Sequence, residues 1–61
     1  MPWTIDRYPP AMSRLHMDVR QKAIQIANAL LDEGYDEGRA IRIAIAAAKR
    51  WALRAGAYVA G

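Results

Sequence analysis

Three residues near the middle of the chain, Gly34, Tyr35 and Asp36, constrain its fold more than any other feature. Glycine often ends an α-helix, because it adopts the left-handed conformation without strain. Aspartate is a preferred N-cap, because its carboxylate accepts hydrogen bonds from free N–H groups of the first turn. The flanking segments have helical patterns, so we predict helices at about 17–33 and 36–55, joined by a structural turn. So short a connection makes the helices antiparallel neighbours, and the predicted fold class is an all-α αα-hairpin.

The first predicted helix has one apolar and one polar face. At about 100° per residue, its aliphatic side chains share one arc, whereas Gln21, Gln25 and Asn28 lie opposite. Arg20 falls inside the apolar arc but close to the helix start, where a long side chain can extend its charge into water. His16 precedes the helix and is interpreted as a cap or a surface residue.

Residues 1–15 hold all three prolines of the chain and little helical signal. Proline fixes φ and biases the residue before it towards extended backbone. Trp3 and Tyr8 are among the apolar side chains that this segment can bury. We therefore predict an extended arm packed over the helices, within a single small helical domain, 1–61, that ends in a short tail, 56–61.

The second predicted helix carries apolar residues around most of its circumference between positions 40 and 48. A helix of this kind needs to be enclosed, yet a hairpin supplies one helical neighbour. The 61-residue chain also has no cysteine for disulfides and is close to the lower size limit of a stable monomer. We therefore predict a homodimer formed through this helix. The predicted self-association residues are Ile41, Ile43, Ala44, Ile45, Ala48, Trp51 and Leu53.

The same helix carries a basic stripe, and the chain has a net charge of +3. The stripe can be a solvated face, or it can contact anions such as nucleic-acid phosphates. Against nucleic acid, the hairpin lacks the third helix of DNA-binding helix-turn-helix domains, and the carboxylates at the turn would repel DNA. The residues predicted for anion or nucleic-acid contact are Arg39, Arg42, Lys49, Arg50 and Arg54.

Four carboxylates lie close together around the turn. Their spacing does not fit a calcium loop of the EF-hand type, and a hairpin tip offers no cleft for a catalytic acid pair. Asp36 and Glu37 support the start of the second helix, whereas Asp32 and Glu33 oppose the dipole of the first. The last two are therefore expected to meet a cation, such as Arg39 or an arginine of another chain. A magnesium or manganese site is the alternative.

The sequence contains no nucleophile elbow, P-loop or dinucleotide fingerprint, and it has a single histidine. We therefore expect no enzyme activity, cofactor, metal centre or small-molecule substrate. Basic residues interrupt the most apolar run and no secretory signal is evident, so no membrane partner is expected and the predicted location is the cytoplasm. The predicted function is that of a non-enzymatic interaction protein that self-associates or binds another protein, with nucleic-acid binding as the alternative.

Several linked pieces of the sequence resemble a family of small uncharacterised bacterial proteins. They are residues 1–4 (MPWT), 8–9 (YP), 22–24 (KAI), 27–31 (ANALL), 33–35 (EGY) and 37–41 (EGRAI). Members of the family that this chain resembles occur alone or as the N-terminal module of longer proteins of unknown function. The resemblance implies a bacterial cytosolic protein, and it supplies no activity, cofactor or catalytic residue. It ends near Ala52, where this chain continues into a basic and apolar tail.

Overall fold

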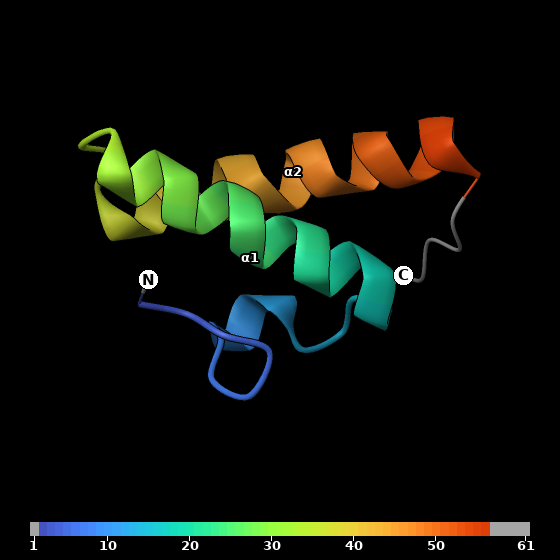
Figure 1. Ribbon diagram of the computed structural model, residues 1–61, viewed down its shortest axis with the longest axis horizontal. Coiled ribbons are helices and arrows are strands. Elements are labelled where there is room, and N and C mark those ends of the chain that lie inside the picture. The colour runs from blue at the N-terminus through green and yellow to red at the C-terminus, as the bar shows by residue number, and fades with distance from the viewer. Residues whose placement is uncertain (1, 57–61) are drawn as a thin grey trace.

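The computed structural model of the chain describes residues 2–56. Its elements are a short 3₁₀ helix η1 (Pro10–Met12), helix α1 (Met17–Asp32) and helix α2 (Glu37–Ala55). The two α-helices lie side by side and antiparallel, and the N-terminal arm runs along α1 and leaves the far side of α2 uncovered (Figure 1). The predicted all-α hairpin is confirmed, and both helices begin and end within one residue of the predicted bounds.

Helix α1 ends in a pair of hydrogen bonds that reverse the chain. The Gly34 N–H donates to the Leu31 carbonyl at 3.0 Å, and the Tyr35 N–H donates to the Leu30 carbonyl at 3.1 Å. Together these bonds form a Schellman motif, whose central residue needs a positive φ. Gly34 supplies it, with φ of +100°. The glycine thus ends α1 and turns the chain back towards it.

Helix α2 is capped at both ends by the residues that the sequence indicates. The Asp36 carboxylate accepts a hydrogen bond from the Arg39 N–H at 3.2 Å. At the other end, Gly56 has φ of +74°, and its N–H donates to the Ala52 carbonyl. The predicted tail begins at this glycine, and the rest of it, 57–61, lies outside the described residues.

A row of alanines forms the surface of α2 that packs on α1. Residues spaced four apart lie on one ridge of a helix, and methyl side chains allow two backbones to approach closely. Val19, Ala23 and Ala27 of α1 are buried in the same core. The alanine row of α2, which is 0% exposed throughout, consists of Ala40, Ala44, Ala48 and Ala52.

The N-terminal arm is not extended throughout, which corrects the prediction. Thr4 and Arg7 pair through two backbone hydrogen bonds of 2.8 and 3.1 Å and close a tight turn. Helix η1 (Pro10–Met12) then adds a helical turn, because proline is well suited to a first helical position, where no N–H is needed. The arm leads into α1 through His16, whose Nδ1 accepts a hydrogen bond from the Asp18 N–H at 3.4 Å. The predicted capping role of His16 is thus confirmed.

Arg20 fastens the arm to α1. Its guanidinium donates to the carbonyls of Met12, Ser13 and Leu15 at 3.2, 3.0 and 2.9 Å. It also lies over the Tyr8 ring, 4.7 Å from the centroid. The expectation that Arg20 extends into water is therefore wrong, because carbonyl oxygens at the end of η1 and just after it accept hydrogen bonds from its guanidinium.

Asn28 fastens the arm at a second point. Its side-chain Oδ1 accepts from the Trp3 N–H at 3.3 Å, and its Nδ2 donates to the Trp3 carbonyl at 3.0 Å. Asn28 is 4% exposed, so its prediction as part of a solvated polar face is wrong. The physical reason is that the arm covers a second side of α1, and the amide of Asn28 satisfies the backbone that this contact buries.

Candidate functional site

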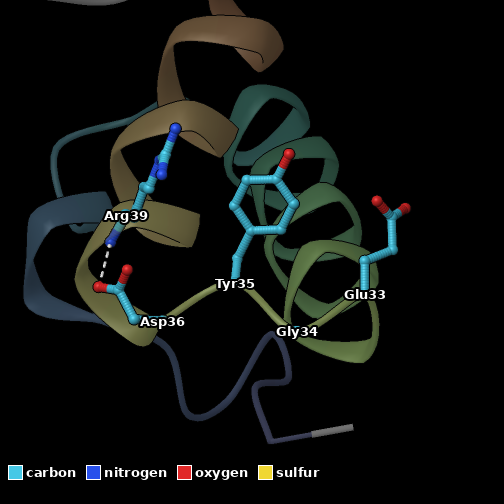
Figure 2. A pocket seen from close by; sticks show the side chains of 5 residues that line it. All are labelled: Glu33, Gly34, Tyr35, Asp36 and Arg39. Atoms are coloured by element: carbon cyan, nitrogen blue, oxygen red, sulfur yellow. Dashed lines mark hydrogen bonds between the residues drawn. The ribbon is translucent and has the colours of Figure 1, made fainter.

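The predicted structural turn forms one end of the hairpin, and Figure 2 shows its side chains. Glu33, Gly34, Tyr35, Asp36 and Arg39 line an open hollow of about 280 Å³. The Arg39 guanidinium lies over the Tyr35 ring, 5.6 Å from the centroid, in a cation–π contact. Arg39 is therefore tied to the turn twice, through this ring and through its backbone N–H.

The carboxylates of the turn do not form a paired site. Figure 2 shows Glu33 and Asp36 on opposite sides of the Tyr35 ring. Among residues 2–56, no group of three or more histidine, cysteine, aspartate or glutamate side chains could hold a metal ion. Asp32 and Glu33 are exposed, and Arg39 stacks on Tyr35 instead of pairing with either of them. The turn thus has the geometry of a helix junction.

The residues predicted for self-association do not share one surface. Ala44 and Ala48 are fully buried against α1, so they belong to the intramolecular core, which corrects their assignment to a surface between copies. Three more, Ile41, Ile45 and Trp51, are half-buried and pack against this core. Trp51 also lies under the Lys22 ammonium, 5.4 Å from the ring centroid.

The two remaining residues of that set differ from the others. Ile43 is half-buried, and Leu53 is 72% exposed, the most exposed large apolar side chain among the described residues. On a helix with about 100° per residue, both lie on the side of α2 opposite the alanine row. We call this side the outer face of α2. It covers an arc of about 120° and consists of Arg39, Arg42, Ile43, Ala46, Arg50, Leu53 and Arg54.

The basic residues gather on this outer face. Arg39, Arg42, Arg50 and Arg54 are exposed there, and Lys49 is half-buried at its edge. Within the described part of the chain, Arg42, Lys49, Arg50 and Arg54 form no ion pair. Arg50, Leu53 and Arg54 together line a shallow hollow of about 300 Å³. The outer face therefore combines unneutralised cations with an exposed apolar side chain.

Sequence reasoning missed Asn28 and Arg20, the two residues that hold the arm. The sequence contains a signal for both residues. Arg20 lies inside the apolar arc of α1, and Asn28 lies one helical turn after the buried Ile24. That pattern is typical of a helix covered on two sides, by another helix and by irregular backbone whose polar groups need partners.

Fold and surface together define a class of protein, an α-helical hairpin with a fastened N-terminal arm and an uncovered basic face. The chain is similar to the uncharacterized protein YdaT of Bacillus subtilis (strain 168), with 56% identity over 55 residues. The aligned region makes up 90% of this chain and 37% of YdaT, so the chain spans little more than a third of that protein's length. No protein-family model and no solved structure matches the chain. The similarity supports the resemblance to uncharacterised bacterial proteins.

Within residues 2–56, no helix is both long enough and apolar enough to span a lipid bilayer.

Proposed function

We propose that the chain is a non-enzymatic interaction module and that the outer face of α2 is its binding surface. The observation that carries this proposal is the 72% exposure of Leu53 on a helix face that neither α1 nor the arm covers. Exposed leucines are ordinary one at a time, but this one lines a shallow hollow together with Arg50 and Arg54. An apolar contact with charged surroundings is typical of a surface that recognises a partner. The predicted cytoplasmic location remains a prediction.

Self-association through this face is the form of the proposal that the sequence favours. A second copy would cover Leu53, but it would also bring the arginines of two outer faces together. We therefore expect the dimer, at twice 6.8 kDa, to become more abundant as salt is added, because screening weakens repulsion between exposed charges. Light scattering at micromolar concentration over a range of salt measures this.

Leu53→Lys should reduce the dimer, whereas Met17→Lys, at an exposed apolar residue of α1, should leave it unchanged. A single 6.8 kDa species at every salt concentration would contradict self-association.

Nucleic-acid binding is the second candidate function. It is favoured by four exposed arginines, from Arg39 to Arg54, on one face of a helix segment about 22 Å long. We expect a labelled oligonucleotide to bind with an affinity that falls steeply between about 50 and 200 mM salt, because each phosphate contact releases counterions. Fluorescence anisotropy measures the slope, and Arg42→Ala or Arg50→Ala should each lower it by about 1.

Arg14→Ala is the matched control, because Arg14 is exposed but lies outside α2. An affinity that does not change with salt, or an equal loss in the Arg14 variant, would exclude the outer face of α2 as a phosphate-binding surface.

A further inference from the structure

We infer that the partner held by the outer face of α2 is an acidic amphipathic helix of another protein. This inference rests on the proposed function, and it names the chemistry of the partner that the face recognises.

Three apolar residues and one arginine of the face have the spacing of a helix-pairing seam. Ile43, Ala46, Arg50 and Leu53 follow one another at intervals of three, four and three residues. This is the a and d spacing of a coiled coil, in which side chains of one helix insert between those of the other. The small Ala46 side chain leaves space at the middle of the seam, while Leu53 stands out at one end. A second helix can therefore lie along this face and bury Leu53.

The charges beside the seam have a single sign. In the same heptad register, the flanking g positions are Arg42 and Lys49, and the flanking e positions are Ala47 and Arg54. Residues at e and g set partner choice in paired helices, because they lie opposite the partner's own e and g residues. Arg50, inside the seam, adds another positive charge. The face therefore matches a helix with glutamate or aspartate at its e and g positions.

A second copy of the chain matches this surface less well. Both parallel and antiparallel pairing would place e and g residues of one copy against those of the other, and none of them is acidic. Like charges in such positions are destabilising. The acidic residues of the chain lie elsewhere, at the turn and on other segments, and Arg42, Arg50 and Arg54 have no carboxylate partner within residues 2–56.

Nucleic acid also matches the outer face of α2 less well than an acidic helix does. Phosphate groups would neutralise the arginines but would leave the exposed Leu53 and the half-buried Ile43 without an apolar contact. An acidic amphipathic helix satisfies both features at once, since its apolar side meets the seam and its carboxylates meet the cations.

The test uses the full chain and a synthetic labelled peptide of about three heptads, with leucine at a and d and glutamate at e and g. One control peptide has the same composition in scrambled order, and another has lysine at e and g. Fluorescence anisotropy should show about tenfold weaker binding of both controls. Leu53→Lys in the chain should weaken binding of the glutamate peptide to a similar degree, with Met17→Lys as the matched control.

A charge-reversed chain makes the test specific. Arg42→Glu combined with Arg54→Glu should transfer the preference from the glutamate peptide to the lysine peptide, whereas Arg7→Glu combined with Arg14→Glu, an equal change of charge at two exposed residues outside α2, should not. Circular dichroism confirms that each variant keeps its helices. Transfer of preference in the α2 variant alone requires contact with the outer face of α2, because an effect of net charge would change both double variants equally.

Three outcomes would overturn the inference. Equal binding of the scrambled peptide, or tighter binding of an oligonucleotide of matched charge, would show recognition of polyanions without a helix seam. Absence of peptide binding together with a dimer in light scattering would refute the acidic partner and leave the interaction function standing. Absence of peptide binding, of a dimer and of oligonucleotide binding would refute both.

Discussion

Ala48→Leu is expected to destabilise the hairpin by about 1–3 kcal/mol, because a much larger side chain would be forced between two closely packed helices. Ala48 is fully buried, and its core cluster holds four other alanines, Ala23, Ala27, Ala44 and Ala52. An alanine has no rotatable side chain that could make room for leucine, so we expect α1 and α2 to separate locally. The free energy of unfolding can be measured by urea denaturation followed by circular dichroism.

This loss is large for so small a protein. At about 0.05–0.15 kcal/mol per residue, a chain of 61 residues has a stability of about 3–9 kcal/mol. The matched control is Ala46→Leu, the same substitution in the same helix at an exposed position. Because leucine has a helix propensity close to that of alanine, this control should change stability by no more than about 0.5 kcal/mol. Equal destabilisation by the two substitutions would refute the close alanine contact.

Arg20→Met should destabilise the protein by about 1.5–3 kcal/mol, the range for hydrogen bonds that involve a charged group. Methionine keeps the apolar stem of the side chain but removes the donors that serve the carbonyls of Met12, Ser13 and Leu15. We expect the arm to detach while the hairpin remains, because Arg20 contacts the arm through its guanidinium. Limited proteolysis between residues 2 and 16 should therefore become faster, with little change in helical circular dichroism.

Arg14→Met is the control for this result. Arg14 lies in the arm and is exposed, so its loss should leave both stability and proteolysis nearly unchanged. If Arg20→Met lowered the helical signal as much as it accelerated cleavage, the arm and the hairpin would have to unfold as one unit.

The parts of the fold that depend on nearby residues could be predicted from the sequence. Gly34 and Asp36 act on backbone groups within a few positions of themselves, so their residue types suffice to place the end of α1 and the start of α2. The bonds from Asn28 to Trp3 connect residues that are 25 positions apart. No local preference encodes such a contact, and a helical wheel assigns Asn28 to water.

The candidate surface shows a related difficulty. Helix α2 has apolar residues on two sides, and periodicity alone does not say which of them packs on α1. The predicted self-association set therefore mixed Ala44 and Ala48, which are in the core, with Leu53, which is exposed. The structure separates them because the alanine row fits a close helix contact, and this leaves the larger Leu53 on the opposite side.

The alanine row also has a thermodynamic consequence. The heat capacity change of unfolding rises with the apolar surface that unfolding exposes, and methyl groups expose little of it. A hairpin whose helix contact is built from Ala40, Ala44, Ala48 and Ala52 should have a small heat capacity change for its length. Its stability should then vary gently with temperature, so that the arm and any bound partner experience nearly the same scaffold in cold and in warm cells.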